Sequence, residues 1–417
     1  MFLGRISTQL KKVISNKDGR VLMQNFAYLS ILQVIGYVFP LITVPYLARV
    51  IGVDGYGKIA FAASIVVYFQ TFVDWGFSYT AVRDIAQNKD NKQIVSRIFS
   101  NVLFSKFILL VFSAIIFFLL ILTVPLLYEN RVVLTYSFLL IPGYILFPDW
   151  LFQAMEEMKY ITIMNFCSKL FFTILVFFVI KEKDDYVFEP LLIAMGMMVS
   201  GLFAMIYGVR KFKLNVKFTS FHELFYMIKK SSNMFISLFL PNLYTNFSVT
   251  LLGVFGGPVA TGLYSSGKKF IDLSDQFSNI LSRTFFPFLA RRLDKHSLYV
   301  KISGGISILV SVILFCSADL LISLFYTSEF AEASTVLRIM SVSPFFLFLM
   351  NTFGPNYLVL KGREDILRNI IVFCSLFGFV LAWLAIKYFN YIGVAITVTS
   401  VWGFRGILTW FYARRVC

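Results

Sequence analysis

Apolar segments long enough to cross a lipid bilayer recur along the whole chain, and this repetition limits the fold more than any other feature. The hydrocarbon core of a bilayer is about 30 Å thick, which a helix of about 20 apolar residues spans. Only 14% of the 417 residues are charged and 49 are phenylalanine, whereas roughly a quarter of the residues in a soluble domain are charged. Because backbone N–H and C=O groups cannot stay unpaired in lipid, each such segment must be helical. The sequence therefore predicts an all-α integral membrane protein.

The apolar segments predict about twelve transmembrane helices, each of the length that a bilayer requires. They lie near residues 25–48, 57–79, 98–123, 132–153, 160–180, 190–209, 233–254, 258–289, 299–324, 333–360, 368–387 and 391–412. The longest hydrophilic stretch falls at the midpoint, which divides the chain into two predicted six-helix bundles. The expected parts are an N-terminal segment 1–24, a first bundle 25–209, a basic linker 210–232, a second bundle 233–412 and a tail 413–417.

Basic residues are unevenly distributed between the two sides of the predicted membrane. With both termini in the cytoplasm, about 25 Lys and Arg residues fall in cytoplasmic segments against about six on the other side, an asymmetry that orients membrane proteins. The net charge of +16 therefore needs no nucleic acid partner. The four cysteines and two histidines lack ligand spacing, so we expect no metal site. Without a Walker motif or a catalytic Ser/His/Asp set, we expect no cofactor and no enzymatic activity.

A short glycine motif occurs once in each predicted half. Gly52-VDGY-Gly57 follows the first span, and Gly257-PVAT-Gly262 follows the seventh with the same spacing. Pro40 interrupts the first span and Pro241 the seventh, which makes both prolines hinge candidates. The pattern fits two parallel repeats related by an axis along the membrane normal. Chance recurrence of glycine-rich turns between helices is the alternative.

The eighth predicted span carries a charged stripe. At about 100° per residue, Lys268, Asp272, Asp275, Asn279 and Arg283 fall within an arc of roughly 80° on one side of the helix. A charge that faced lipid at mid-depth would cost about 2.5–3.5 kcal/mol even on the lenient insertion scale. The stripe must therefore face protein or water.

Other spans add charges without an evident partner in sequence, and cations outnumber acids. These are Lys106, Lys169, Arg338 and Arg405, with Asp74, Asp149 and Asp319, and Lys269 of the eighth span likewise lacks a partner in sequence. We interpret them as the lining of an aqueous, mildly cationic cavity between the two halves. Structural ion pairs that join helices are the alternative for any single residue.

The seventh predicted span supplies a polar wall beside Pro241. Asn242, Tyr244 and Asn246 both donate and accept hydrogen bonds, as sugar hydroxyls require, although such residues also join membrane helices. Arg and Lys are the natural partners of phosphate oxygens. The composition of the cavity thus predicts a transporter for an anionic, hydroxyl-rich cargo, driven by an ion gradient or by removal of the cargo on the far side.

Several stretches carry a resemblance to a known family. NFAYLSILQVIGYVFPLITVPYLARVIGVDGYGKIAFAASIVVYF, followed by DWGFSYTAVRDIA, resembles the start of the Wzx-type O-antigen flippases of the multidrug/oligosaccharidyl-lipid/polysaccharide exporter superfamily. LFPDWLFQAMEEMKYIT, PNLYTNFSVTLLGVFGG and VATGLYSSGKKF agree in register, so the resemblance covers nearly the whole chain. Ala154 stands where the family pattern has glycine, which we interpret as a mild packing change.

The resemblance implies a V-shaped protein of two six-helix bundles in the bacterial inner membrane. It would move an undecaprenyl-pyrophosphate-linked oligosaccharide repeat unit from the cytoplasmic to the periplasmic leaflet, and contact with the O-antigen polymerase machinery is a further partner that it suggests. The predicted cavity residues are Lys169, Asn242, Tyr244, Asn246, Lys268, Lys269, Asn279, Arg283, Arg338 and Arg405. Asp74, Asp272 and Asp275 are candidates for binding a coupling H⁺ or Na⁺.

Two other functions compete with this interpretation. A multidrug/cation antiporter of the same superfamily would need a cavity of net negative charge, whereas the intramembrane charges here lean positive. A polysaccharide polymerase or ligase would need a large external loop, and every predicted external loop is short.

Overall fold

The computed structural model describes residues 17–291 and 293–416, and within these ranges the chain is helical and contains no β-strand. The prediction of an all-α protein is therefore confirmed. Residues 1–16, most of the predicted N-terminal segment, lie outside the described residues.

The first half of the chain forms helices that follow one another through short connections. They are α2 (Lys17–Asp74), α3 (Phe77–Ala86), α4 (Lys92–Thr123), α5 (Pro125–Glu129), α6 (Arg131–Phe138), α7 (Leu140–Leu146), α8 (Asp149–Ala154), α9 (Met158–Val179), η1 (Lys183–Val187) and α10 (Phe188–Lys211). Caps explain some of the starts. The Asn91 side chain accepts the N–H groups of Gln93 and Ile94, both at 3.1 Å, and so begins α4.

The second half has the same helical character. Its elements are α11 (Phe221–Phe239), η2 (Leu240–Leu243), α12 (Asn246–Phe255), α13 (Gly257–Arg291), η3 (Leu293–Lys295), α14 (His296–Cys316), α15 (Ala318–Phe325), η4 (Ser328–Phe330), α16 (Ala333–Met340), α17 (Ser343–Phe353), η5 (Gly354–Val359) and α18 (Glu364–Arg415). The predicted linker 210–232 differs from expectation, because α10 ends at Lys211 and α11 begins at Phe221. Within the predicted linker, only residues 212–220 are non-helical.

Two long helices each consist of two arms. α2 changes direction at Gly52 (φ +64°, ψ −176°), and α18 changes direction at Asn390 (φ +51°, ψ −131°). Among the described residues, eight helices are long and apolar enough to cross a membrane, or nine if α11 and α12, bent by 50° at η2, form one span. α13, with 35 residues, is long enough to cross a membrane, but it is not among these helices because its charged stripe makes it too polar for this count. The count of twelve spans and the cytoplasmic termini stay predictions.

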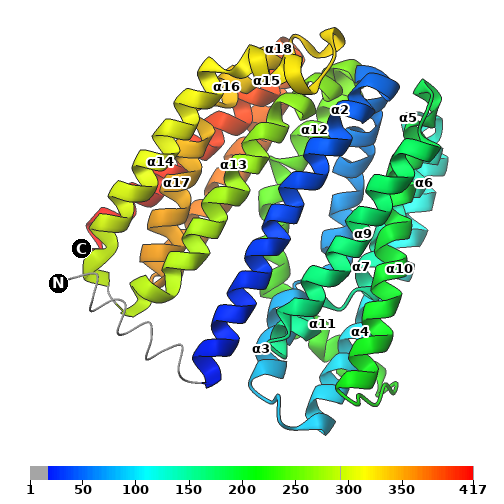
Figure 1. The fold of residues 1–417 in the computed structure, drawn as a ribbon, viewed down its shortest axis with the longest axis vertical. Coiled ribbons are helices and arrows are strands. Elements are labelled where there is room, and N and C mark those ends of the chain that lie inside the picture. Colours follow the sequence, from blue (N-terminus) through cyan, green and yellow to red (C-terminus); the bar gives the residue numbers. More distant parts are fainter. Residues whose placement is uncertain (1–16, 292, 417) are drawn as a thin grey trace.

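The helices form two groups that lie close together at one end of the molecule and spread apart toward the other, as expected for a V shape (Figure 1). α2, α12 and α13 lie between the groups. α2 begins and α18 ends at the end where the groups spread apart (Figure 1). α13, which carries Lys268, Lys269, Asp272, Asp275 and Asn279, is thus a central element.

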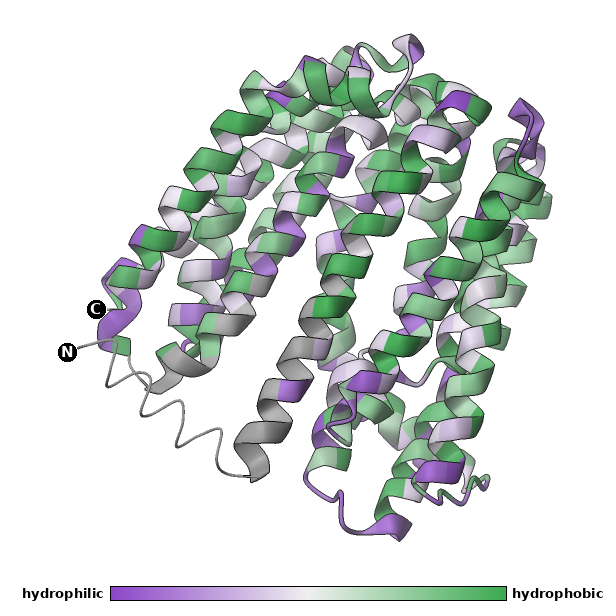
Figure 2. Cartoon of the chain, in the orientation of Figure 1, coloured by the Kyte–Doolittle hydropathy of each residue, from purple (hydrophilic) through white to green (hydrophobic). Residues whose placement is uncertain are grey.

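The outward faces of the helices are apolar. Figure 2 shows hydrophobic positions along the outer helices and hydrophilic ones mainly at the helix ends and along the inner helices. On α4, Leu119 and Leu122 are 55% and 70% exposed, and on α14, Leu309 is 59% exposed. A soluble protein rarely exposes apolar patches of more than a few hundred Å². This belt suits lipid, so the chain is a multi-pass membrane protein.

The two glycine motifs predicted as repeats contact each other. A Cβ atom on Gly57 would lie 1.7 Å from the carbonyl oxygen of Pro258, and a Cβ atom on Gly262 would lie 2.3 Å from the carbonyl oxygen of Val53. Val53 and Pro258 occupy equivalent places in the two motifs, so the contact is reciprocal. Only glycine lets the α2 and α13 backbones approach this closely.

Side chains around this crossing extend the contact between the halves. Tyr56 of α2 packs edge-on against Tyr326 and Phe330, with ring centroids 6.0 and 5.9 Å apart. The N–H of Val53 donates to the Glu329 carboxylate at 3.3 Å, which caps the second arm of α2 from the other half of the chain. A Cβ on Gly52 would lie 2.8 Å from the same carboxylate oxygen.

Four charges that seemed to lack partners in the sequence are paired, which corrects that interpretation. Lys106 of α4 donates to Asp74 of α2 at 2.7 Å, and Ser78 donates to the same carboxylate oxygen at 2.7 Å. Arg338 of α16 forms an ion pair with Asp319 of α15. Each pair joins neighbouring helices, the role that the alternative interpretation assigned to them.

The glycine crossing predicts a sharp difference between two substitutions. Gly57→Ala places a methyl carbon 1.7 Å from the Pro258 carbonyl oxygen, a distance at which the two atoms clash. We therefore expect it to destabilise the protein by about 3 kcal/mol, the upper part of the usual range for overpacking. Gly305→Ala is the control, because a Cβ there meets nothing within 4 Å and alanine favours a helix by up to about 1 kcal/mol. Thermal unfolding of the purified variants in nanodiscs measures both. Equal unfolding midpoints would contradict the close crossing.

The pair of Lys106 and Asp74 predicts a second difference. The Lys106 side chain is only 7% exposed, so Asp74→Asn leaves a buried cation without its partner and should destabilise the protein by about 3 kcal/mol. Adding Lys106→Met should restore most of that loss. Asp54→Asn, which breaks the more exposed Lys58–Asp54 pair, should change stability by less than about 1 kcal/mol. If the two Asp→Asn variants unfold alike, Lys106 does not depend on Asp74.

Candidate functional site

The charged stripe of α13 begins with a local ion pair. Lys268 Nζ lies 2.5 Å from Asp272 Oδ1, one turn along the helix. Asp275 follows on the next turn, and Asn279 hydrogen bonds its carboxylate. α13 packs against α2 on one side and against α16, α17 and α18 on the other. Because Lys268 and Asp272 neutralise each other, Asp275 is the carboxylate of the stripe that remains available to other cations.

Arg405 reaches this stripe from α18. One guanidinium nitrogen donates to the hydroxyl of Tyr244 at 3.3 Å, while Nε is buried and has no hydrogen-bond partner among the described residues. Asp275 and Arg405 lie within electrostatic range of each other. Tyr244, only 1% exposed, is fixed against α18 because its Cβ lies 2.8 Å from the position of a Cβ on Gly378. The guanidinium therefore keeps one buried donor, Nε–H, without a hydrogen-bond partner among the described residues.

Cations from the two halves approach each other next to the first arm of α2. A Cβ on Gly36 would lie 3.6 Å from Lys169 Nζ of α9 and 3.7 Å from Gln276 Oε1 of α13. Lys169 and Lys269 lie within electrostatic range of each other, as do Lys269 and Glu189 of α10. Two ammonium groups within electrostatic range repel each other. An anion placed between them would relieve that repulsion.

The polar side chains of the seventh predicted span form hydrogen bonds between helices. Asn242 donates to the Thr71 hydroxyl at 3.2 Å, Tyr68 donates to the Asn242 carbonyl at 2.9 Å, and Asn246 donates to the Asn242 side-chain oxygen at 2.7 Å. These bonds attach η2 and α12 to the second arm of α2. Such bonds are what the alternative interpretation expected, in which these residues join membrane helices. Contact of the same residues with a cargo stays a prediction.

The remaining predicted residues lie apart from this cluster or outside the described part. Arg338 is paired with Asp319, and Asp74 with Lys106. The side chain of Arg283 lies outside the described residues. Pro241 lies in η2 at the 50° bend, whereas α2 continues as a helix through Pro40. The hinge role of either proline stays a prediction.

Two residues of the site were missed in the sequence. Gln276 lies one turn beyond Asp272 and two turns beyond Lys269, a spacing that could have identified it as a continuation of the stripe. Asn351 of α17 donates to both Ser278 and Asn279, each at 3.3 Å, and no local pattern marks it. Among the described residues, no group of three or more His, Cys, Asp or Glu side chains could hold a metal ion.

Known structures share the fold over nearly the whole chain. The lipid II flippase MurJ, in an inward closed conformation, has a TM-score of 0.74 and 12% identity, with 94% of this chain and 87% of that chain covered. An inward-facing multidrug resistance MATE-family transporter of the MOP superfamily has a TM-score of 0.58 and 14% identity, with 94% and 98% covered. Both comparisons concern the fold alone.

Two curated relatives are closer in sequence, and both carry the name "Putative O-antigen transporter". The one from Escherichia coli (strain K12) is 28% identical over 397 residues, which cover 92% of this chain and 95% of the relative. The one from Shigella dysenteriae is 24% identical over 385 residues, with 90% and 96% covered. The resemblance to O-antigen flippases predicted from the sequence is confirmed by these relatives.

A family model described as "Polysaccharide biosynthesis protein" matches residues 22–293, from α2 to the end of α13 and slightly beyond. The matched range is more than half of the chain and includes α13 with its charged stripe. Two relatives named "Putative O-antigen transporter" match nearly the full length of this chain. The protein therefore belongs to the polysaccharide biosynthesis protein family.

Proposed function

We propose that this protein is a flippase that moves undecaprenyl-pyrophosphate-linked O-antigen repeat units from the cytoplasmic to the periplasmic leaflet of the bacterial inner membrane. The observation that carries the proposal is the set of cations around α13 that lack an ion-pair partner at salt-bridge distance among the described residues: Lys269, Lys169 and Arg405, contributed by both halves of the chain. The names of the two curated relatives support the class of cargo.

The chemistry of this cargo matches the groups on the central helices. Pyrophosphate needs several charge-assisted hydrogen bonds, and Arg405 has a donor without a protein partner. Lys169 and Lys269 repel each other unless an anion lies between them. The lipid tail remains in the bilayer, so only the headgroup has to pass between the two bundles.

Alternating access accounts for the passage. The two six-helix bundles, with both termini in the cytoplasm, would rock against each other around the glycine crossing, as in other transporters built from repeats. An ion gradient of H⁺ or Na⁺ would drive the cycle, with Asp272 and Asp275 as candidates for the coupling ion. Removal of the cargo by the polymerase machinery on the periplasmic side would also favour net transport toward the periplasmic leaflet.

The leaflet that holds the cargo tests this function directly. In cells depleted of the protein, single lipid-linked repeat units should accumulate on the cytoplasmic side of the inner membrane. A membrane-impermeant reagent that modifies sugars, applied to spheroplasts, measures the exposed fraction. Repeat units that reach the outside but stay unpolymerised would assign the missing step to polymerisation. Unchanged sugars with altered drug export would favour the multidrug/cation antiporter.

Removal of cations from the central helices should stop transport. A charge-assisted hydrogen bond contributes about 1.5–3 kcal/mol, and 1.4 kcal/mol is a factor of ten in affinity. Lys269→Ala combined with Arg405→Ala should therefore lower the rate of export at least about 10-fold at normal protein level. Arg131→Ala combined with Lys387→Ala removes two exposed cations and should leave export unchanged. Wild-type export by the first variant would contradict the assignment of these cations.

A further inference from the structure

The short helix α8 has an exposed face that is entirely polar, although it belongs to a membrane span. Its two exposed residues are Asp149 and Gln153, and they lie four residues apart, so their side chains are neighbours on one face. The other residues of α8 are buried, namely Trp150, Leu151, Phe152 and Ala154. Since the outward faces of the helices are apolar, this face is suited to water or a polar ligand rather than to lipid.

Asp149 has acceptor capacity that the protein does not use. Its Oδ1 accepts the N–H of Trp150 at 2.8 Å, a bond within its own turn. Among the described residues, no Lys or Arg side chain lies at ion-pair distance from it, because the nearby Lys106 is paired with Asp74 at 2.7 Å. A carboxylate has two oxygens and about four acceptor positions. Asp149 therefore offers several of them to the hydroxyl groups of a ligand.

Tyr144 of α7 extends this face to a deeper level of the same span. Its side chain is 42% exposed although protein surrounds it on most sides, as expected for a ring on the wall of a recess. Its hydroxyl lies within hydrogen-bonding reach of Gln70 of α2 and within electrostatic range of Asp149. Gln70, Tyr144, Asp149 and Gln153 together form what we call the α7–α8 surface.

The α7–α8 surface adjoins the second half of the chain. Gln70 is flanked in α2 by Tyr68 and Thr71, which form hydrogen bonds with Asn242 of η2 at 2.9 and 3.2 Å. α8 packs against α3, which lies at the end where the two groups of helices spread apart (Figure 1). A headgroup that enters between the groups from this end would meet the α7–α8 surface.

The composition of the surface suits a sugar ring. A pyranose has an edge of hydroxyl groups and a face of C–H groups, so it needs hydrogen-bond partners together with an apolar platform. Asp149 and the amides of Gln70 and Gln153 supply the partners, and the exposed ring of Tyr144 supplies the platform. Water would hydrate the polar groups but leave the ring face uncovered, whereas covering that face with C–H groups is favourable.

Other parts of a lipid-linked headgroup fit the surface less well. Asp149 would repel a pyrophosphate, and an acyl chain would remove the amides and the carboxylate from water without giving them partners. A metal ion would need several ligands of its own kind, and no group of three or more His, Cys, Asp or Glu side chains in the described part of the chain could hold one. An uncharged sugar is the moiety that uses all four side chains.

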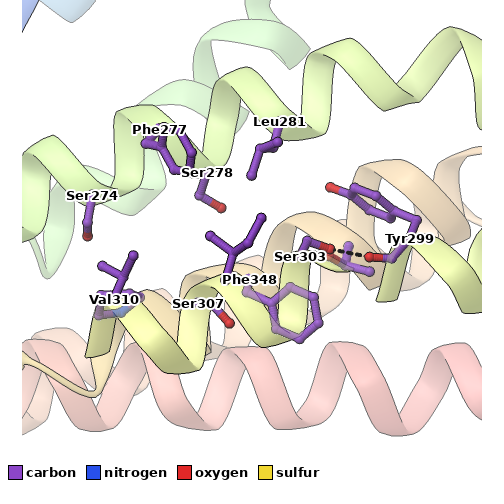
Figure 3. Close-up of a pocket in the computed structure, with 12 residues that line it drawn as sticks. Ser274, Phe277, Ser278, Leu281, Tyr299, Ser303, Ser307, Val310 and Phe348 are labelled. Atoms are coloured by element: carbon purple, nitrogen blue, oxygen red, sulfur yellow. Dashed lines mark hydrogen bonds between the residues drawn. The ribbon is translucent and has the colours of Figure 1, made fainter. Parts of the chain in front are cut away.

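The second half contains a polar cavity that is too small for a sugar. It lies between α13, α14 and α17 and has a volume of about 20 Å³, enough for one water molecule. Figure 3 shows that serines share its lining with apolar side chains such as Phe277, Leu281 and Val310. The α7–α8 surface is exposed and is not limited in this way.

We propose that Gln70, Tyr144, Asp149 and Gln153 form a subsite that binds an uncharged sugar residue. That this sugar belongs to the lipid-linked cargo rests on the proposed function, whereas the binding of a sugar does not. The first half would then hold the sugar through α2, α7 and α8, while Lys169, Lys269 and Arg405 hold the pyrophosphate. The two chemistries of the headgroup would be recognised at separate places.

Binding of a free oligosaccharide to the purified full-length protein in nanodiscs tests the subsite. The probe is the repeat unit released from the O-antigen of the strain that carries the protein, without lipid or pyrophosphate, and saturation-transfer NMR measures its dissociation constant. Wild-type protein should bind it saturably. Asp149→Ala should weaken binding at least about 10-fold because it removes charge-assisted hydrogen bonds. Tyr144→Leu should weaken it about 5-fold because it removes the ring.

Matched variants keep the test decisive. Glu129→Ala and Tyr388→Leu remove an exposed carboxylate and an exposed tyrosine elsewhere, and both should bind the probe as the wild type does. If Asp149→Ala or Tyr144→Leu fails to fold, Gln153→Ala replaces it, since that exposed side chain has no hydrogen-bond partner among the described residues. Absence of saturable binding by the wild type would overturn the proposal. So would wild-type affinity in every folded variant of the surface.

A second probe shows whether the two chemistries are separate. Inorganic pyrophosphate should bind the Tyr144→Leu variant as tightly as it binds the wild type. Lys269→Ala combined with Arg405→Ala should lose pyrophosphate but keep the free oligosaccharide. If this double variant loses the oligosaccharide while the variants of the α7–α8 surface keep it, the sugar lies among the cations and the proposed subsite is wrong.

The leaflet measurement separates this inference from the proposed function. If Tyr144→Leu loses the oligosaccharide and also accumulates repeat units on the cytoplasmic side, the subsite recognises the cargo. Normal translocation by the same variant would overturn that role. If the wild type binds the oligosaccharide at this surface but its depletion leaves every repeat unit outside, the proposed function fails and the sugar subsite stands.

Discussion

The contact between the backbones of α2 and α13 at Gly57 and Gly262 determines how the rest of the molecule is arranged. Each glycine takes the place that a side chain would need, and each lies against a carbonyl of the opposite motif. Backbones this close leave the two groups of helices joined at one end (Figure 1), where Tyr56 and Glu329 add aromatic packing and a helix cap. α13 then runs from this junction along α2. Its Gln276 lies beside Gly36 of the other half, while Asp275 and Asn279 of its stripe lie near Arg405 and Asn351 of its own half.

Within that arrangement, the state of each charge on these helices depends on whether a partner lies on a neighbouring helix. Lys106 and Asp74 neutralise each other, and so do the more exposed Arg338 and Asp319. Burying Lys106 is costly, and the pair is stable because both of its charges are compensated. Arg405, Lys169 and Lys269 are different. Lys169 and Lys269 lie within electrostatic range of each other, with Glu189 as the carboxylate near Lys269, and the Arg405 Nε–H has no hydrogen-bond partner among the described residues. An anionic ligand would supply the partner that these cations lack, which is why these three residues carry the proposal of an anionic cargo.

The sequence predicts this site only as far as its interactions are local. The stripe of α13 follows from helical periodicity, and the pair of Lys268 and Asp272 from their spacing of four residues. The partnership of Lys106 with Asp74 joins two helices, and Asn351 reaches Ser278 from a helix that no pattern links to α13; such contacts depend on packing that periodicity does not contain. The two glycine motifs show the same limit. Their spacing indicates a repeat, but their direct contact follows from the way the two halves meet.

The division of the seventh predicted span into α11 and α12 has a mechanical consequence. α11 is held by helices of the first half, through Trp75 Nε1 donating to the Ile228 carbonyl at 2.9 Å and through Lys230 paired with Asp84 at 2.5 Å. α12 instead packs against α13 and α18 as well as α2. In the proposed rocking motion, α11 would stay with the first group and α12 would move with the second, so we expect the change in angle at η2, where the hinge role of Pro241 stays a prediction. Pro241 suits that position because it lacks the N–H that would otherwise strengthen the helix across the bend.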